Sequence, residues 1–140
     1  MAWRTLTEQD LAATLSQDEI GKYRRSHPDG ADPVSDLLSR TAELVRAYCR
    51  ANRSVRVPAS AGLVPESLVS PAMDYAAFDV LKRLPLKVGE DRRKARDDAV
   101  ALLEAVAAGR VTPESADDEL DAAAAGSPAA APASPPRLLD

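Results

Sequence analysis

The residues that most often build catalytic, metal or disulfide sites are scarce in this sequence. The 140 residues include one cysteine and one histidine, so one chain forms neither an internal disulfide nor a multi-Cys or multi-His metal site. Aromatic residues make up 4% of the chain, which argues against an all-β sandwich. No apolar run approaches the ~20 residues of a membrane span, and the N-terminus lacks the apolar region of a signal peptide. These absences lead us to expect a soluble, mostly helical, cytoplasmic protein.

Charge is distributed unevenly along the chain. The formal net charge is −4, of which residues 113–140 carry −5 while the first 112 residues sum to +1. Every residue from 122 to 136 is Ala, Gly, Ser or Pro, a composition that buries too little apolar surface to offset the entropy of ordering it. We therefore predict a helical domain over 1–112 and an acidic, Ala/Pro-rich, low-complexity tail over 113–140.

Capping residues mark the first helices. Thr7 is an N-cap followed by acidic residues, which favour a helix N-terminus. Ser16 and Glu19 match a capping box, so a second short helix is expected over 17–25. The stretch 54–65 contains no helical spacing and is expected to be extended or irregular.

Three longer helices follow. The pairs Asp32-Pro33 and Ser70-Pro71 each place Pro at the first helical position after a capping residue, so they begin helices that reach about residues 52 and 84. The last helix is expected over 90–108, with Gly109 as its C-terminal stop.

Each longer helix presents one apolar face at helical spacing. Tyr75 and Phe78 widen the face of the middle one, which we expect to be the most buried helix. The predicted core residues are Leu37, Leu44, Met73, Ala77, Val80, Leu81, Leu84, Leu102, Leu103 and Val106. The predicted fold is all-α, a small bundle of four to five helices with a long C-terminal tail.

No catalytic or metal-binding pattern is present. His27 lies in a Pro/Gly loop without the orienting partner that a general base needs, so we interpret it as a loop histidine. Cys49 is expected to be a partly buried structural thiol. The spacing of Asp29, Asp32 and Asp36 does not match a calcium-binding loop. We therefore expect no enzyme activity, no bound metal and no cofactor.

Two stretches are rich in cations. In residues 82–96, the nearby Asp97 and Asp98 favour solvated helix faces with ordinary intrahelical pairing. Residues 40–56 contain five Arg and one acid, Glu43, and here a surface facing phosphate or an acidic partner and a solvated surface both stay open. The candidates for channel or subunit contacts are Arg46, Arg50, Arg53 and Arg56.

Four segments occur in an order that is typical of one protein family. They are Ala47–Arg50 (AYCR), Val64–Ala76 (VPESLVSPAMDYA), Leu81–Leu84 (LKRL) and Asp98–Arg110 (DAVALLEAVAAGR). Together they resemble the small helical head-to-tail connector proteins (adaptor or head-completion proteins) of tailed bacteriophages, the Mu-like branch in particular. The resemblance spans about residues 5–110.

The resemblance implies a non-enzymatic structural protein of the virion neck, assembled in the bacterial host cytoplasm. Such proteins form a ring, usually of about twelve copies, under the portal and extend the DNA channel. The implied partners are the portal protein, neighbouring subunits, a stopper or tail-terminator protein and, by proximity only, the packaged DNA; no membrane is involved. Relatives dock a C-terminal segment on the portal, and here the expected contacts are Arg137, Leu138 and Leu139.

Two other functions stay open. The chain is alternatively a DNA-associated packaging or regulatory subunit that places its Arg-rich helix end on phosphates, or a helical bundle without an assembly role. For the connector, we expect the isolated chain to be monomeric at micromolar concentration.

Overall fold

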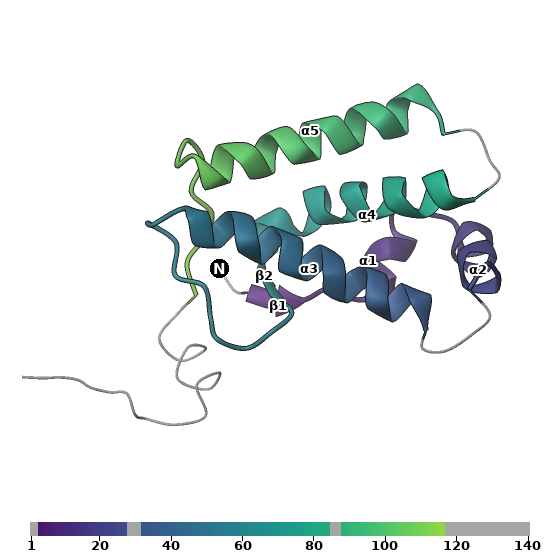
Figure 1. Ribbon diagram of the computed structural model, residues 1–140, viewed down its shortest axis with the longest axis horizontal. Coiled ribbons are helices and arrows are strands. Elements are labelled where there is room, and N and C mark those ends of the chain that lie inside the picture. The colour runs from purple at the N-terminus through teal and green to yellow at the C-terminus, as the bar shows by residue number, and fades with distance from the viewer. Residues whose placement is uncertain (1–2, 28–31, 85–87, 117–140) are drawn as a thin grey trace, which may run out of the picture.

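The computed structural model describes residues 3–27, 32–84 and 88–116 (Figure 1). Within these ranges it contains five α-helices and one two-stranded sheet, which confirms the predicted all-α class. The elements are β1 (Trp3–Thr5), α1 (Glu8–Ala12), α2 (Gln17–Arg25), α3 (Pro33–Ala51), β2 (Leu63–Pro65), α4 (Val69–Arg83) and α5 (Glu90–Ala107).

The predicted caps of the first helices are confirmed. The hydroxyl of Thr7 accepts from the Asp10 N–H, and the Asp10 carboxylate accepts from the Thr7 N–H at 2.8 Å, which makes this helix start a capping box. Ser16 and Glu19 form the expected capping box at α2. The Asp32 carboxylate caps α3. Each of these bonds satisfies a backbone donor that the helix itself leaves without a partner.

Gly109 ends α5 as predicted. Its φ is +85°, in the left-handed region that residues with a Cβ rarely adopt. The Gly109 N–H donates to the Val106 oxygen at 3.1 Å and the Arg110 N–H to the Ala105 oxygen at 2.9 Å. These two bonds are those of a Schellman motif, which satisfies the last carbonyl groups of the helix.

The predicted start of α4 at Ser70-Pro71 is wrong by two residues. A 3-10 turn over Glu66–Leu68 runs directly into the helix, and Leu68 occupies the N-cap position without a side-chain hydrogen bond. Pro71 is therefore the third helical residue. A proline is tolerated there because the first N–H groups of a helix have no intrahelical acceptor.

The small sheet joins two distant parts of the chain. β1 and β2 are antiparallel, with Trp3 opposite Pro65 and Thr5 opposite Leu63. The sequence indicated only an extended stretch near β2, because a three-residue strand carries too short a pattern to identify its partner.

The three long helices lie side by side, and each packs against the other two (Figure 1). Helices α1 and α2 pack against α3 and α4. The chain runs back along α4 and forward again along α5, so α3 and α5 end at the same end of the bundle (Figure 1). No helix in the described ranges has the length and apolar character to cross a membrane.

Most of the predicted core is buried. Leu44 and Leu102 are the exceptions, since both are half-buried; Leu102 packs against the core from its edge. The other predicted core residues are buried, namely Leu37, Met73, Ala77, Val80, Leu81, Leu84, Leu103 and Val106.

Candidate functional site

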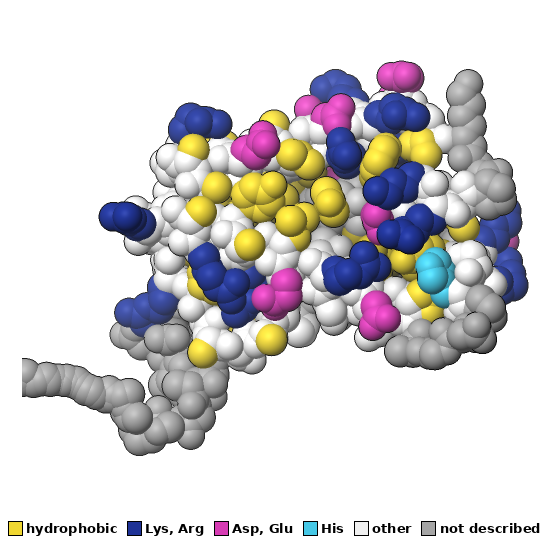
Figure 2. Space-filling model, in the orientation of Figure 1, with side chains coloured by type: hydrophobic (Ala, Val, Ile, Leu, Met, Phe, Trp, Pro, Cys, Tyr) yellow, Lys and Arg dark blue, Asp and Glu magenta, His cyan; other side chains and the backbone are white. Residues whose placement is uncertain are grey.

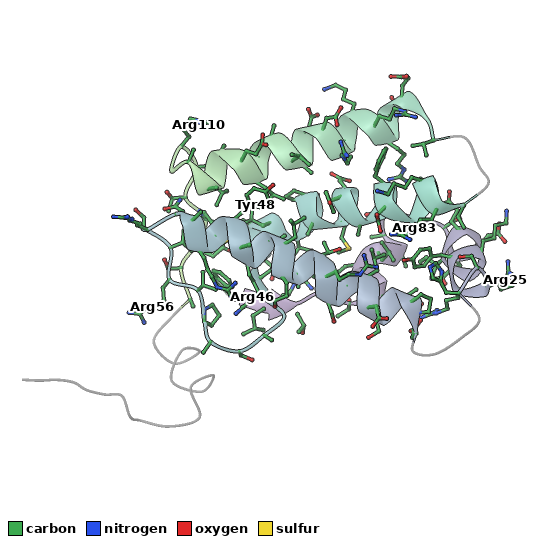
Figure 3. All side chains as sticks on the ribbon, in the orientation of Figure 1. Arg25, Arg46, Tyr48, Arg56, Arg83 and Arg110 are labelled. Carbon is green, nitrogen blue, oxygen red and sulfur yellow. The ribbon has the colours of Figure 1, made fainter. Side chains whose placement is uncertain are left out.

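Arg46 lies inside the subunit, which corrects its prediction as a channel or subunit contact. Its side chain, which is labelled in Figure 3, has an exposed fraction of 2%. The two terminal nitrogens donate to the carbonyl oxygens of Leu63 at 3.0 Å and Pro58 at 2.8 Å, and Nε lies 3.3 Å from the Glu43 carboxylate. Burial lowers the pKa of Arg46, and the Glu43 charge opposes that shift. The guanidinium fixes the segment before β2 to α3, so it is not available to phosphate or to another subunit.

The other three predicted arginines are exposed at the end of the bundle where α3 and α5 finish. Arg110, just beyond α5, is exposed at this end too, and Figure 3 shows Arg56 and Arg110 projecting there. We call Arg50, Arg53, Arg56 and Arg110 the arginine end. Among the described residues, Arg50, Arg53 and Arg110 form no ion pair. Cations are favourable beside helix C-termini, where the helix dipoles are negative.

No pattern in the sequence indicated directly that Arg110 belongs to this group. A signal was nevertheless present, because three consecutive long helices that run up, down and up bring the C-termini of the first and third helices together. Figure 2 shows Lys and Arg side chains around this end of the molecule.

The chain after α5 returns alongside the arginine end. The Asn52 side chain donates to the Val111 oxygen at 3.2 Å, the Arg56 N–H donates to the Ser115 hydroxyl at 3.0 Å, and the Ala116 N–H donates to the Arg56 oxygen at 3.0 Å. Residues 113–116, which we assigned to the tail, therefore contact the helical body. The domain boundary at residue 112 stays a prediction.

Three of the five aromatic residues are only half-buried. Trp3 and Tyr23 are buried, whereas Tyr48 on α3 and Tyr75 and Phe78 on α4 are only partly covered. The last two were expected to extend a buried stripe. They lie instead at the edge of it, because a helix with neighbours on two sides buries less than the full width of a broad apolar face.

These aromatic side chains form one surface together with Leu44. Leu44 and Tyr75 line the same cavity of about 150 Å³ between α3 and α4. Tyr48 follows Leu44 by one helical turn, and Phe78 follows Tyr75 by one turn, so the four are neighbours along the two helices. We call them the aromatic face. Figure 2 shows hydrophobic side chains gathered in the middle of the view over these helices.

The second basic stretch is largely paired within the subunit. The pairs are Lys82–Asp79, Arg83–Asp79, Lys94–Asp98 and Arg96–Asp97, with N–O distances of 3.3, 3.6, 3.1 and 2.9 Å. The Arg96 guanidinium carbon also lies 4.8 Å from the centre of the Phe78 ring, a cation–π distance. These contacts support the interpretation of residues 82–96 as solvated helix faces.

Two clefts contain carboxylates. In an open cleft of about 640 Å³ beside α1 and α4, Arg4 pairs with Asp10 at 2.8 Å and with Glu66 at 3.1 Å, so these charges satisfy one another. A cleft of about 290 Å³ between α4 and α5 is lined by Asp74 and Asp98. Burial raises the pKa of Asp74, the Arg92 charge opposes that shift, and the nearby Asp98 charge adds to it. Neither histidine nor cysteine is among the described residues that line the two clefts.

The surroundings of the single cysteine and the single histidine fit structural roles for both residues. Cys49 is fully buried, and burial raises the pKa of its thiol to about 11. His27 Nδ1 lies 3.0 Å from the Tyr23 oxygen and 2.9 Å from the Ser26 hydroxyl. Within residues 3–27, 32–84 and 88–116, no group of three or more His, Cys, Asp or Glu side chains is placed to hold a metal ion. Asp29, from the rejected calcium pattern, lies outside the described residues.

The predicted tail contacts Arg137, Leu138 and Leu139 also lie outside the described residues, so their role stays a prediction.

One comparison with known proteins gave a match. The family described as "Bacteriophage Mu, Gp36" matches residues 6–131 of this chain. The resemblance to connector proteins covers about residues 5–110, so the family match extends further along the chain, into the residues assigned to the tail. A search of curated proteins gave no match, and neither did a search of solved structures.

Proposed function

The chain belongs to the bacteriophage Mu Gp36 family, and from this premise we propose that it is a non-enzymatic structural protein of the phage neck. Copies of the chain form a ring, about twelve by the resemblance to connectors, between the portal and a stopper or tail-terminator protein. The ring extends the DNA channel. In this proposal the protein is assembled in the host cytoplasm and resides in the virion neck.

The aromatic face is the structural observation that supports the proposal. A chain with five aromatic residues leaves three of them only half-buried on two adjacent helices. Tyr and Phe are enriched at the centres of protein interfaces, where they bury a large area at a low cost in side-chain entropy. In the proposed ring, the aromatic face contacts a neighbouring subunit or the portal.

A ring requires each copy to contact its neighbour through two different surfaces. Many such contacts act in parallel when the portal holds the copies together, so each contact can be weak while the assembly is stable. This is why we expect a monomer in isolation and a ring on the portal. In the same arrangement, Arg137, Leu138 and Leu139 reach the portal as an additional attachment.

The test is assembly on purified portal particles from the same phage, followed by sedimentation and electron microscopy. Wild-type chain is expected to bind the portal as a ring. The double variant Tyr48→Ser/Tyr75→Ser is expected to bind at least tenfold more weakly. The control is Val111→Ser, which removes an apolar side chain that is 39% exposed and does not belong to the aromatic face.

Two results contradict the proposal. One is wild-type chain that stays monomeric in the presence of portal at saturating concentration. The other is a stable ring of isolated chain at micromolar concentration in light scattering, which contradicts assembly driven by the portal.

The alternative function, a DNA-associated packaging or regulatory subunit, is favoured by a different observation, the arginine end. Burial of Arg46 removes one predicted phosphate contact, and the exposed Arg110 adds another. A gel shift of duplex DNA that weakens steeply with salt is expected from this alternative, because each phosphate contact releases counterions. The connector is expected to bind DNA weakly outside its ring.

A further inference from the structure

Cationic side chains lie at one end of the aromatic face. Arg40, which precedes Leu44 on α3 by one helical turn, is exposed and lines the same cavity as Leu44 and Tyr75. Asp36 and Glu43, the two acids of α3, form no ion pair with Arg40, and no other residue in the described ranges does so. Figure 2 shows Lys and Arg side chains next to the hydrophobic side chains in the middle of the view.

The neighbouring cations of α4 are only partly neutralised. The Asp79 carboxylate is shared by Lys82 Nζ at 3.3 Å and Arg83 Nε at 3.6 Å, so one negative charge faces two positive charges. Both cationic side chains are about half exposed, at 51% and 47%. We call Arg40, Lys82 and Arg83 the cationic rim. Its three cations exceed the one carboxylate that they surround, which leaves this end of the aromatic face positively charged.

We propose that the aromatic face and its cationic rim bind an acidic segment of a different polypeptide. The segment places one apolar side chain in the cavity between α3 and α4 and its carboxylates on the cationic rim. This inference rests on the proposed function, which makes the aromatic face an interface, and it adds the chemistry of the partner. In the neck it favours the portal over a neighbouring copy as the protein that covers the face.

The cavity is suited to an apolar group. Its lining includes Leu37, which is 2% exposed, and Thr41, whose buried hydroxyl already donates to the Leu37 oxygen at 2.8 Å. Its volume of about 150 Å³ accommodates a group of the size of benzene. One Leu, Met or Phe side chain of the partner therefore fits between Leu44 and Tyr75, where it buries apolar surface from both polypeptides.

The cationic rim selects a partner with carboxylates. Guanidinium and ammonium groups form charge-assisted hydrogen bonds with carboxylates, and a charged rim around an apolar centre is the usual anatomy of a protein interface. A nucleic-acid backbone uses the cations but leaves the apolar centre uncovered. Two copies that meet through this same face bring cation against cation, which is unfavourable. An acidic segment with an apolar anchor satisfies both parts of the surface.

The first test measures binding of probe peptides to the full chain by fluorescence anisotropy. Three labelled peptides of about 15 residues have Leu at the same helical spacing and Glu, Gln or Lys at the other positions. At 50 mM salt the Glu peptide is expected to bind at least tenfold more tightly than the Gln peptide, and the Lys peptide more weakly than both. The advantage is expected to shrink at 300 mM salt, because exposed charges are screened. Equal binding of the three peptides, or binding of none, overturns the proposal.

Variants then assign the binding to the two parts of the surface. Arg40→Gln/Lys82→Gln, which leaves Arg83 to pair with Asp79, is expected to weaken binding of the Glu peptide about fivefold and to leave the Gln peptide unchanged. Tyr75→Ser is expected to weaken both peptides. Full affinity of Tyr75→Ser for the Glu peptide overturns the proposal, because the cavity then takes no side chain.

The matched control is Lys22→Gln/Arg25→Gln on α2. Like the rim variant, it removes two exposed cations, of which one is paired, since Lys22 lies 3.3 Å from Asp18. Arg25 projects from α2 at the far end of the molecule (Figure 3). The control is expected to bind the Glu peptide as wild type does. An equal loss in the control overturns the proposal, since net charge alone then explains the binding. Thermal melts of all variants confirm that folded proteins are compared.

Binding to portal particles separates this inference from the neck function. Portal binding that is weakened about fivefold by Arg40→Gln/Lys82→Gln supports both. Portal binding that this variant leaves unchanged retains the neck function and overturns the acidic partner. A chain that binds the Glu peptide but not the portal contradicts the neck function and supports the acidic partner.

Two other occupants of the face have their own outcomes. Self-association of the isolated chain that Tyr75→Ser abolishes in sedimentation overturns the proposal, because a second copy then covers the face. Binding of duplex DNA that is lost in Arg40→Gln/Lys82→Gln and retained in Tyr75→Ser also overturns it, because the cationic rim then serves phosphate alone.

Discussion

The indole of Trp3 donates a hydrogen bond of 2.9 Å to the backbone oxygen of Glu114, 111 residues away in the sequence. Trp3 is 3% exposed and lies in β1, so this bond closes the described chain between its first strand and its last residues. Glu114 also accepts through its carboxylate from the Ser67 N–H at 3.1 Å. The segment after α5 is therefore held by the body on two sides.

Replacing Trp3 with Phe is expected to destabilise the protein by about 2–3 kcal/mol. The change leaves the Glu114 carbonyl without its donor, which costs about 1–3 kcal/mol when the group is buried, and the smaller ring leaves a gap in the core. Urea unfolding followed by circular dichroism measures the effect. Ser115→Ala, which removes two exposed hydrogen bonds of the same segment, is the control and is expected to cost less than about 1 kcal/mol. An unchanged midpoint for Trp3→Phe would contradict the role of the bond.

Arg46→Met is expected to cost about 2–4 kcal/mol of stability, although the side chain is charged and was predicted to face a partner. The substitution removes both donors from the carbonyl oxygens of Pro58 and Leu63, and breaking a buried charged network is among the costliest single changes. Arg46→Lys is also expected to destabilise, because a single ammonium does not reach two carbonyls as a planar fork does. Arg50→Met, on the exposed surface, is expected to stay within about 0.5 kcal/mol. Equal urea midpoints for the variants at 46 and 50 would contradict the assignment.

The contrast between Arg46 and the helix caps explains which features the sequence could reveal. Thr7 and Ser16 bond to residues three positions ahead, so their caps are visible as local spacing. The stop at Gly109 is equally local, because one residue adopts the left-handed conformation. The long helices were likewise predicted from apolar spacing within each of them.

Features that depend on distant segments were not predictable in the same way. The acceptors of Arg46 lie 12 and 17 residues further on, in a stretch without periodic pattern, and β1 pairs with a strand about 60 residues away. The exposure of Tyr75 depends on how far α3 and α5 cover α4. Apolar spacing identifies the centre of a buried face, whereas its edges are set by the neighbouring helices. The candidate site consists largely of side chains at the edges of buried helix faces, as in the aromatic face, and of side chains at helix C-termini, as in the arginine end.

Stability is expected to fall as the pH drops from about 4 to 2, and Asp10 contributes to this loss. The hydrogen bonds from Arg4, with smaller contributions from Thr7, lower the pKa of Asp10 to about 2 from an ordinary value of 3.8. A carboxyl whose pKa is lower in the folded state stabilises the fold above its unfolded pKa and loses that contribution on protonation. The expected contribution is about 1–2 kcal/mol after allowance for solvent screening.

The measurement is urea unfolding at pH 5 and at pH 2.5. Asp10→Asn is expected to be less stable than wild type at pH 5 and to approach it at pH 2.5. Asp18→Asn, which alters a side chain that is 72% exposed, is expected to reproduce the wild-type dependence on pH. A constant difference between Asp10→Asn and wild type at both values would show that the carboxyl acts through packing alone.

Cys49 is expected to be unreactive in the folded protein. Its thiol is fully buried with a pKa of about 11, and the thiolate is the form that attacks thiol reagents. With an aromatic disulfide reagent at pH 8, labelling of native chain is expected to follow the rate of unfolding, while chain in 8 M urea reacts within seconds. Fast labelling without urea would show that α3 opens locally around this residue. Cys49→Ser is expected to lose more stability than Cys49→Ala, because it buries a hydroxyl where the described residues offer mainly apolar neighbours, and equal urea midpoints for the two variants would contradict that reading of the site.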